Sequence, residues 1–380
     1  MNEKQNIRKK ICFVATTTSI INEFLLEHIE LLSENFDIYI VVKLDDKIET
    51  NKVKSIFSLN IERKPNLIKD LTCLILLTKY FRKNKFDLVQ TITPKGGFIG
   101  ILSAFFAMVP IRIHAFTGQV WTTKTGFSKF YLKQIDKLIE RFSTKIVVDS
   151  ISQRNYLLEH NIISKEKSFV LGHGSICGVN KIKFNSNEIT RSMYRRKIAI
   201  PESSVVYTYM GRLNREKGVL DLVESFYKLN AKFSNTKLVF IGKDEEQIQT
   251  LIKKNSQNGN IIFIPYTRIA FEYLQITDIF CLPSYREGFG SSVIEASMLS
   301  IPVICSDIYG LKESCIDGVT GLKFKPGNID EIYNCMLQLL LNKDLRIQLG
   351  LNGQQYVSER YDSKLITKLW KDFYCAQLYF

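Results

Sequence analysis

Short apolar runs, rich in β-branched and aromatic residues, alternate with longer amphipathic stretches in the first half of the chain. The runs are typical of buried strands and fall at 11–15, 38–42, 88–92, 111–116 and 146–148. The stretches between them predict helices at 21–34, 66–83, 97–109, 127–143 and 151–160. Strands that alternate with helices form a parallel sheet through crossover connections. The first half therefore predicts a doubly wound α/β domain.

A polar segment of poor periodicity, 185–204, interrupts this alternation, which then restarts. The later strands are predicted at 205–211, 238–241, 261–264, 279–282 and 303–306, and the later helices from 218 and at 245–255, 328–342, 344–358 and 363–376. We expect an N-terminal domain over 1–184, a linker over 185–204, a C-terminal domain over 205–360, and a C-terminal helix within 361–380 that packs back on the N-terminal domain. Open parallel sheets bind ligands beyond the carboxyl ends of their strands, so two such domains facing a central cleft place the chemistry in strand-end loops.

Length and composition fit this two-domain prediction. The chain has 380 residues, 45% of them hydrophobic and 24% charged, which is typical of a globular protein and excludes a disordered or collagen-like chain. The longest apolar stretch, 97–111, is too short to span a bilayer, and the polar N-terminus has no signal-peptide pattern. Eight scattered cysteines form no C-x-x-C pair and are predicted to be reduced thiols. We expect a cytoplasmic protein.

The net charge of +14 is concentrated in the first half, where residues 1–190 hold 28 Lys and Arg against 18 Asp and Glu. Such a field attracts nucleic acid, anionic lipid and nucleotide diphosphates alike, and charge alone does not choose among them. Basic residues follow the apolar run 71–77 directly, at Lys79, Arg82, Lys83 and Lys85. This arrangement predicts peripheral, salt-sensitive attachment to the inner face of the cytoplasmic membrane.

The segment PSYREGFGSSVIE, 283–295, combines a carboxylate with an anion site. A strand ends there, Glu287 follows in the loop, and glycines at 288 and 290 lead into a helix that begins near Ser291. Glycines let backbone N–H groups approach a ligand, and a helix N-terminus favours diphosphate. Glu295 lies one turn into that helix, so both carboxylates can address one extended ligand. The spacing also fits an ordinary strand-to-helix turn with a solvated Glu and a capping Ser.

A second group, GRLNREKG at 211–218, follows the first strand of the second domain. Arg212 and Lys217 lie five positions apart beside a strand-end glycine, Gly211, and a new helix start. Two fixed cations can neutralise a departing diphosphate, Arg by forking onto two oxygens and Lys as a point charge. A solvated basic turn is the alternative, but two anion-ready loops on one sheet favour a ligand site.

Other chemistries lack their motifs. No D-x-D metal motif, no G-x-x-x-x-G-K-[ST] loop and no G-x-S-x-G elbow occurs in the sequence. The four histidines show no metal-ligand spacing. The basic residues are not interleaved with aromatics, and no nucleic-acid motif appears. We expect no metal, no cofactor and no nucleic-acid partner.

GRLNREKG followed by EGFGSSVIE resembles the donor site of glycosyltransferase family 4, and the stretch 301–324 is similar to the same family. This resemblance implies the GT-B fold of two Rossmann-like domains, and the E-x7-E motif is met by Glu287 and Glu295. In the first half, HAFTGQVW (114–121), VDSISQRNYL (148–157) and LGHGSICGVN (171–180) resemble a bacterial subgroup that builds O-antigen and related polysaccharides on polyprenyl diphosphate.

The resemblance implies roles for individual residues. Arg212 and Lys217 would hold the nucleotide diphosphate, Glu287 the sugar hydroxyls and Glu295 the ribose, while His114 would lie near sugar and acceptor; the catalytic residues implied are thus His114, Arg212, Lys217 and Glu287. The donor-binding residues implied in this way are Gly211, Arg212, Lys217, Gly242, Tyr266, Glu287, Gly288, Phe289, Gly290, Ser291 and Glu295. The acceptor-binding residues are Lys95, His114, Thr117, Gly118 and Gln119.

The resulting prediction is a retaining glycosyltransferase. The resemblance favours transfer of N-acetylgalactosamine from UDP-GalNAc, through an α-1,3 bond, to an undecaprenyl-diphosphate-linked N-acetylhexosamine in O-antigen or capsule synthesis. Donors such as UDP-Glc, UDP-Gal or GDP-Man stay open, since sugar choice depends on a few hydrogen bonds. A non-hydrolysing sugar-nucleotide epimerase shares the two-domain architecture, and a basic nucleic-acid-binding module is the alternative that is not an enzyme.

Overall fold

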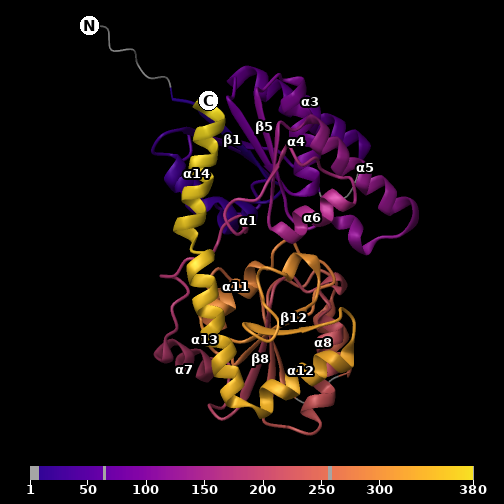
Figure 1. The fold of residues 1–380 in the computed structure, drawn as a ribbon, viewed down its shortest axis with the longest axis vertical. Helices are drawn as coiled ribbons and strands as arrows, with labels where there is room; N and C mark the ends of the chain where they lie inside the picture. Colours follow the sequence, from indigo (N-terminus) through magenta and orange to yellow (C-terminus); the bar gives the residue numbers. More distant parts are fainter. Residues whose placement is uncertain (1–7, 63–65, 256–258, 380) are drawn as a thin grey trace. The chain divides into compact units, whose positions relative to one another are not determined.

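The chain folds into two α/β units, each built on a parallel sheet (Figure 1). The computed structural model describes residues 8–62, 66–255 and 259–379. The first unit runs to Cys177 and includes the C-terminal segment from Ser363, and the second unit spans Gly178–Asp362. The boundary comes earlier than the expected one at 184, and the segment 185–204, expected as a linker, lies inside the second unit.

The first sheet has seven strands in the order β3-β2-β1-β4-β5-β6-β7, and its strand pairs are parallel. The strands are β1 (Lys10–Val14), β2 (Asp37–Val42), β3 (Ser55–Ser58), β4 (Leu88–Ile92), β5 (Ile111–Phe116), β6 (Lys145–Val148) and β7 (Ser168–Phe169). The five predicted strands are all present. Both edge strands were missed, because β3 is short and largely exposed and β7 has only two residues.

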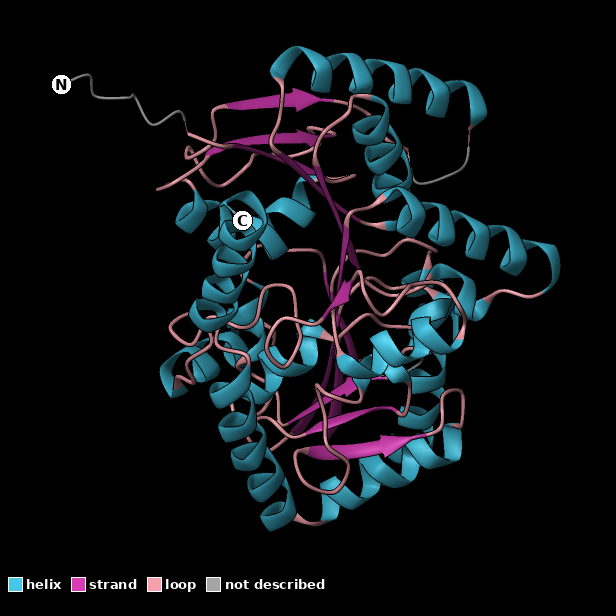
Figure 2. Cartoon of the chain, turned by 45° about the horizontal axis from the view of Figure 1, so that its top comes forward, coloured by secondary structure: helices cyan, strands magenta, loops and turns pink. Residues whose placement is uncertain are grey.

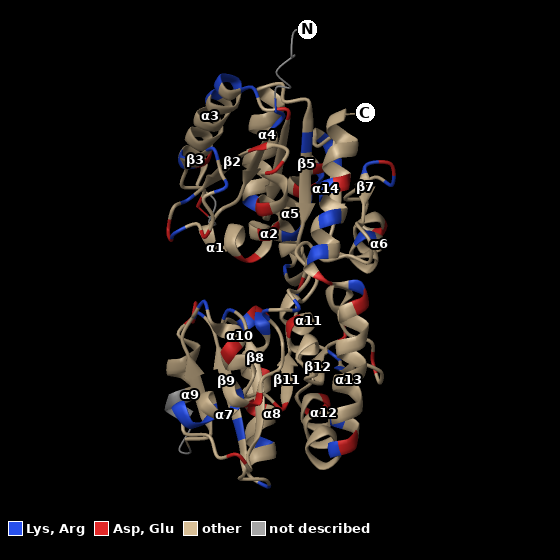
Figure 3. Ribbon diagram, turned by 90° about the vertical axis from the view of Figure 1, so that its left-hand side faces the viewer, with Lys and Arg blue, Asp and Glu red and all other residues tan. Residues whose placement is uncertain are grey.

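Helices cover both faces of this sheet (Figure 2). The helical elements are α1 (Thr18–Ile20), a π-helix (Ile21–Leu25), α2 (Leu26–Leu32), α3 (Leu67–Asn84), α4 (Pro94–Phe106), a 3₁₀ turn (Val120–Thr123), α5 (Gly126–Phe142), α6 (Ile151–Glu159) and α14 (Ser363–Tyr379). Buried side chains of α3, α4, α5 and α6 pack on one face. Those of α2 and α14 pack on the other, where the two helices lie side by side (Figure 3).

The C-terminal helix α14 is part of the core of the first unit. Ile366, Trp370 and Tyr374 are buried against β1 and the neighbouring strands. The Trp370 indole donates to the Ile176 carbonyl at 3.0 Å, and the Tyr374 hydroxyl donates to Gln90 Oε1 at 2.5 Å. Both contacts satisfy polar groups that would otherwise be buried without partners.

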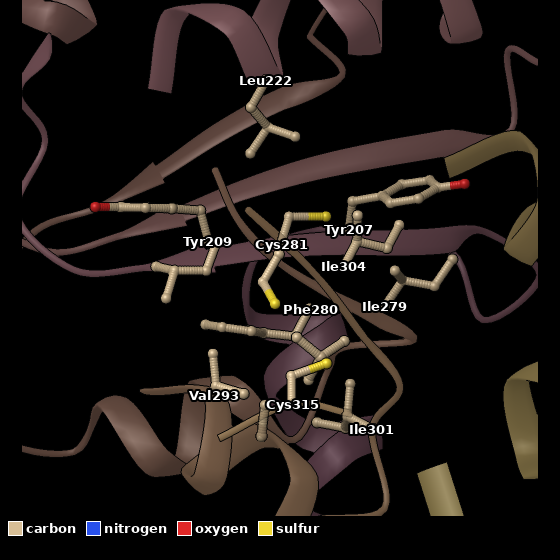
Figure 4. Close-up of a cluster of buried hydrophobic side chains, with 14 of the residues drawn as sticks. Tyr207, Tyr209, Leu222, Ile279, Phe280, Cys281, Val293, Ile301, Ile304 and Cys315 are labelled. Carbon is tan, nitrogen blue, oxygen red and sulfur yellow. The ribbon is translucent and has the colours of Figure 1, made fainter. Parts of the chain in front are cut away.

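The second sheet has six strands in the order β10-β9-β8-β11-β12-β13, again with parallel pairs. They are β8 (Val205–Met210), β9 (Thr236–Ile241), β10 (Ile261–Ile264), β11 (Ile279–Leu282), β12 (Val303–Ser306) and β13 (Gly321–Phe324). The helical elements are α7 (Glu188–Lys197), 3₁₀ turns at Arg215–Lys217 and Tyr309–Leu311, α8 (Val219–Asn230), α9 (Ile248–Asn255), α10 (Ala270–Leu274), α11 (Ser291–Met298), α12 (Ile329–Leu341) and α13 (Lys343–Arg360). Figure 4 shows its core, where Leu222 of α8 and Val293 of α11 lie on either side of the central strands.

Helix α7 occupies half of the predicted linker and is held by an ion pair rather than by an apolar stripe. Arg195 is fully buried, and its guanidinium donates to Asp278 Oδ2 at 2.8 Å and to the Ile276 carbonyl at 2.9 Å. Arg191 also pairs with Asp278, at 2.7 Å. Because the inward face of α7 carries an arginine, the segment lacks the hydrophobic period that marks most helices. This explains why the sequence pattern predicted a linker there.

Within the described residues, no helix is long and apolar enough to cross a membrane.

Candidate active site

Two loops at the carboxyl end of the second sheet pack directly against each other. One follows β8 and holds 211–218, and the other follows β11 and leads to α11. Gly218 has a φ of +64°, and a Cβ atom there would lie 2.0 Å from the carbonyl oxygen of Pro283. The backbone N–H of Tyr285 donates to the Glu216 carbonyl at 3.0 Å. Only a glycine at 218 permits this approach, which brings the two sequence motifs together.

At this junction Lys217 and Glu287 form a largely buried ion pair. The Lys217 ammonium lies 2.5 Å from Glu287 Oε1, and the two side chains are 16% and 14% exposed. The Ser284 hydroxyl donates to the same carboxylate oxygen at 2.7 Å. Burial lowers the pKa of Lys217. Burial would raise the pKa of Glu287, but the Lys217 ammonium and the Ser284 hydroxyl outweigh it and hold that pKa below its usual value.

The pair keeps capacity for a ligand. An ammonium has three donors, and a carboxylate has about four acceptor positions. The bond to Glu287 uses one donor of Lys217, and Lys217 and Ser284 together place two donors on Oε1 of Glu287. A diphosphate can therefore bind the ammonium while sugar hydroxyls bind the carboxylate, with both charged groups already held in place.

Arg212 lies in the same loop as Lys217, but it pairs with a residue after β9, on the other side of β8 from Glu287. Its guanidinium contacts Glu245, which follows β9, at 3.0 Å, and Asn214 Nδ2 donates to the same carboxylate at 3.0 Å. Asn214 Oδ1 also accepts from the Lys217 backbone N–H at 3.1 Å. The β8 loop is thus tied to the β9 loop through Arg212 and to the β11 loop through Lys217. Arg212 is 44% exposed, so it can turn toward a ligand more easily than Lys217.

Helix α11 begins where the glycines at 288 and 290 predicted it. Gly290 is the N-cap with a φ of +77°, a left-handed conformation that favours glycine, and Ser291 is the first helical residue. Glu295 lies one turn further on. The Phe289 side chain does not face a ligand: it is 4% exposed and packs edge-on against Tyr361 with ring centroids 5.0 Å apart. At this position only the backbone is available to a phosphate.

A cavity of about 440 Å³ lies beside these loops, at the ends of β9 and β10. Gly242 and Tyr266, both in the expected donor set, line it together with Pro265. Phe240 and Phe263 stack at its wall with ring centroids 5.3 Å apart. Its volume falls in the range of small-ligand sites, and flat apolar walls suit a planar base.

In the first unit, His114 is buried near the end of β5. The side chain is 1% exposed, and its Nδ1 lies 2.8 Å from the Thr91 hydroxyl oxygen. Burial lowers the pKa of His114 to about 3, so the imidazole is neutral at physiological pH. The ring lies between β5 and α4, since a Cβ atom at Gly97 would come within 2.3 Å of its Cε1 atom. The role expected for His114, near the sugar and the acceptor, stays a prediction.

Of the other residues expected at the acceptor, one forms an ion pair and three lie in the loop after β5. Lys95, at the start of α4, forms an ion pair with Asp70 at 2.8 Å. Thr117 and Gly118 are partly exposed in the loop after β5, whereas Gln119 is 1% exposed. Gln153 of α6 donates to the Thr117 carbonyl at 3.0 Å and to Gln119 Oε1 at 3.3 Å. The side chain of Gln119 therefore braces this loop from inside.

Asp149, directly after β6, was not singled out by the sequence. It is 6% exposed. Burial raises its pKa to about 8, so the folded protein holds it protonated at neutral pH. The adjacent Gln153 ties it to the loop of Thr117, since Gln153 Oε1 accepts from the Asp149 backbone N–H at 2.9 Å. The sequence signal that could have identified Asp149 is a carboxyl residue placed directly after a predicted strand.

Asp149 makes stability depend on pH. An unfolded Asp loses its proton near pH 4, whereas folded Asp149 keeps it to about pH 8, so stability falls as pH rises through this window. Asp136, whose pKa burial raises to about 7 against the opposing hydrogen bond from Trp121, acts in the same direction. In the unchanged protein the urea midpoint should fall between pH 5 and pH 8, and in Asp149→Asn it should fall less. Asp136→Asn should remove only the part of the fall that is due to Asp136. An unchanged slope in Asp149→Asn would contradict this account.

No group of three or more His, Cys, Asp or Glu side chains in the described part of the chain is arranged to hold a metal ion.

Comparison with protein families gives the class of chemistry. Residues 190–356, which include both converging loops, match the model of the glycosyl transferases group 1 family. This protein is a glycosyltransferase. The prediction of an enzyme of this class is confirmed, and the match covers the unit in which Lys217 and Glu287 meet.

The glycosyltransferase is similar over most of its length to curated bacterial enzymes. It is 28% identical to the capsular polysaccharide biosynthesis glycosyltransferase CapM of Staphylococcus aureus, over 90% of this chain and 91% of the relative. It is 26% identical to the UDP-Gal:α-D-GlcNAc-diphosphoundecaprenol α-1,3-galactosyltransferase of Escherichia coli, over 85% of each chain. It is 23% identical to the N,N'-diacetylbacillosaminyl-diphospho-undecaprenol α-1,3-N-acetylgalactosaminyltransferase of Campylobacter jejuni, over 96% of this chain and 98% of that one.

Solved structures confirm the predicted GT-B fold. The glycosyltransferase superposes on Anabaena Alr3699/HepE, solved in complex with UDP and glucose, with a TM-score of 0.82 at 16% identity, over 97% of this chain and all of that one. It superposes on WaaG, a glycosyltransferase involved in lipopolysaccharide biosynthesis, with a TM-score of 0.75 at 15% identity, over 94% and 97% of the two chains.

Proposed function

We propose that this glycosyltransferase moves a sugar from a UDP-sugar to a polyprenyl-diphosphate-linked acceptor during synthesis of a bacterial surface polysaccharide, at the inner face of the cytoplasmic membrane. The observation that carries the proposal is the preformed Lys217–Glu287 pair at the start of α11. The relatives support the substrate class, because the Escherichia coli and Campylobacter jejuni enzymes are both named for undecaprenyl-diphosphate acceptors.

The chemistry follows from the charges of the site. As the bond between the anomeric carbon and the β-phosphate oxygen breaks, negative charge grows on the diphosphate. The Lys217 ammonium and the first N–H groups of α11 stabilise that charge without reorganising, and Arg212 adds to it by turning from Glu245 toward the diphosphate. The acceptor hydroxyl forms the new bond on the same face, and its proton passes to the departing phosphate oxygen. The product then keeps the α configuration of the donor.

Glu287 acts on the sugar rather than as a nucleophile. Its carboxylate is held by Lys217 and Ser284, which stabilise the ionised form and fix its position. A carboxylate so held accepts hydrogen bonds from sugar hydroxyls, and losing such a bond leaves a buried acceptor unpaired. We propose that the cavity beside Gly242 and Tyr266 takes the uracil.

The donor we propose is UDP-GalNAc, added through an α-1,3 bond to an N-acetylhexosamine. Two of the relatives form α-1,3 bonds, and they differ in transferring galactose or N-acetylgalactosamine. The choice between these two sugars depends on whether the site binds the 2-acetamido group or the 2-hydroxyl group, a difference of a few hydrogen bonds.

The test offers labelled UDP-GalNAc, UDP-GlcNAc, UDP-Gal, UDP-Glc and GDP-Man with a short-chain polyprenyl-diphosphate GalNAc acceptor. We expect transfer from UDP-GalNAc and an α-linked product by NMR. Transfer only from GDP-Man or UDP-Glc would overturn the donor, and no transfer to any lipid diphosphate would overturn the acceptor class. Conversion of UDP-sugar incubated alone into its epimer would replace the proposal with epimerisation.

A further inference from the structure

Helix α3 exposes a row of large aliphatic side chains over its first half. Leu67 is 86% exposed, Ile68 81% and Leu71 58%, and Ile75 continues the row at 47%. Ile68, Leu71 and Ile75 recur at spacings of three and four, so they lie on one outward face. Within the apolar run 71–77, which basic residues follow directly in the sequence, residues 73 and 77 are buried in the core.

Helix α5 exposes aromatic side chains at the corresponding end. Phe127 is 80% exposed, Phe130 59% and Tyr131 45%. The rings of Phe127 and Tyr131 stack with centroids 6.4 Å apart, and Leu138 extends the same face. Aromatic rings contribute the most area per residue to an interface, and exposing several of them in water is unfavourable.

Basic residues run beside this aromatic face. Lys129, Lys133 and Lys137 recur every four residues along α5. Burial, followed by the repulsion of its two neighbours, lowers the pKa of Lys133, so the three ammonium groups share one field. Asp136, the acid nearest in sequence, is buried and accepts from the Trp121 indole at 2.8 Å, so its carboxyl group does not face solvent beside the lysines.

The two exposed faces belong to one layer of the first unit. Helices α3 and α5 both contact α4, which lies between them on the same face of the sheet (Figure 1). Helix α3 ends where the chain enters β4, and α5 follows the loop that leaves β5, so both helices begin at the carboxyl edge of the sheet. The loop of Thr117 and Gly118 lies at that edge. The basic C-terminal end of α3, with Arg82 and Lys83, lies at the opposite edge of the sheet and is not part of this surface.

We infer that the first halves of α3 and α5 form a docking surface for an anionic lipid bilayer. This docking surface consists of Leu67, Ile68, Leu71, Phe127, Phe130 and Tyr131, flanked by Lys129, Lys133 and Lys137. Aromatic and aliphatic side chains enter the headgroup boundary while lysines meet anionic lipid. Protein interfaces, in contrast, are depleted of lysine. The inference rests on the proposed function, because a lipid-linked acceptor reaches the enzyme only at such a surface.

Flotation with vesicles tests the docking surface. We expect the full chain to bind vesicles of phosphatidylglycerol and phosphatidylethanolamine at low salt, and phosphatidylcholine vesicles far less. Phe127→Ser/Phe130→Ser and Ile68→Ser/Leu71→Ser should each weaken binding at least tenfold, since each removes two apolar side chains. Ile347→Ser/Leu351→Ser on α13, where both residues are also exposed by half or more, is the matched control and should bind as the unchanged chain does.

Two further readouts separate the docking surface from the active site. The double variants should keep transfer to a short-chain, water-soluble acceptor and lose transfer to a long-chain acceptor held in vesicles. Lys129→Gln/Lys137→Gln should weaken binding to anionic vesicles only. Equal vesicle binding by the Ser variants, or no binding by the unchanged chain, would overturn the inference, as would a surface that instead joins two copies of the chain in sedimentation. If no acceptor receives sugar, the proposed function is overturned. The vesicle-binding result tests the docking surface independently of that outcome.

Discussion

Alanine in place of Lys217 is expected to lower the rate of sugar transfer by about 10²-fold or more, the usual effect of removing one fixed electrostatic stabiliser. The Lys217 side chain is 16% exposed and its ammonium is held 2.5 Å from Glu287, so it meets the departing diphosphate without first being ordered. Glu287→Gln is expected to cost a similar factor, because an amide holds Lys217 less firmly and accepts fewer hydrogen bonds from the sugar.

The matched control for this prediction is Arg215→Ala. Arg215 lies two positions from Lys217 in the same loop, but its side chain is 68% exposed and its guanidinium pairs at 3.7 Å with Glu246, which is itself exposed. Its removal should change the rate about twofold or less, since exposed charges are screened by solvent. Initial rates with saturating acceptor measure all three variants. If Lys217→Ala and Glu287→Gln both turn over near the unchanged rate, the donor diphosphate binds elsewhere.

The second large effect is on stability. Lys217→Met leaves Glu287 buried without its counter-ion, and we expect it to lower the free energy of unfolding by about 3 kcal/mol. The double variant Lys217→Met/Glu287→Gln removes both charges and should cost clearly less than the two single variants added together. The two effects are coupled because each charge is compensated by the other, so removing the second charge no longer leaves an unpaired one.

Urea unfolding of the four proteins in this cycle gives the coupling energy. The exposed pair Lys228–Asp330, at 2.9 Å, is the control and should show a coupling of about 0–1 kcal/mol, as surface pairs do. Additive effects at Lys217 and Glu287 would mean that the pair is solvated in solution and would remove the physical basis for its fixed position.

The fold was predictable wherever burial produced a hydrophobic pattern. The central strands β4 and β11 are buried over their whole length; β11 is a continuous apolar run, and β4 is apolar except at Gln90 and Thr91. The edge strand β3 is short and exposed, and α7 buries Arg195 instead of an apolar stripe. Neither feature leaves the hydrophobic period on which such predictions rest.

The candidate site was predictable in its charged residues but not in their pairing. Lys217 and Glu287 stood out because each follows a strand and sits among glycines. That Lys217 pairs with Glu287 and Arg212 with Glu245 depends on β8 lying between β9 and β11, an order that spacing along the chain does not contain. The resemblance to a family could not reveal that Lys95 pairs with Asp70.

The most direct measurement of the central claim is a crystal structure of the protein with UDP bound. The account predicts the diphosphate within hydrogen-bonding distance of the Lys217 ammonium and of the backbone N–H groups at the start of α11, and the uracil in the cavity beside Tyr266. UDP bound away from Lys217 and α11, with the Lys217–Glu287 pair untouched, would contradict it.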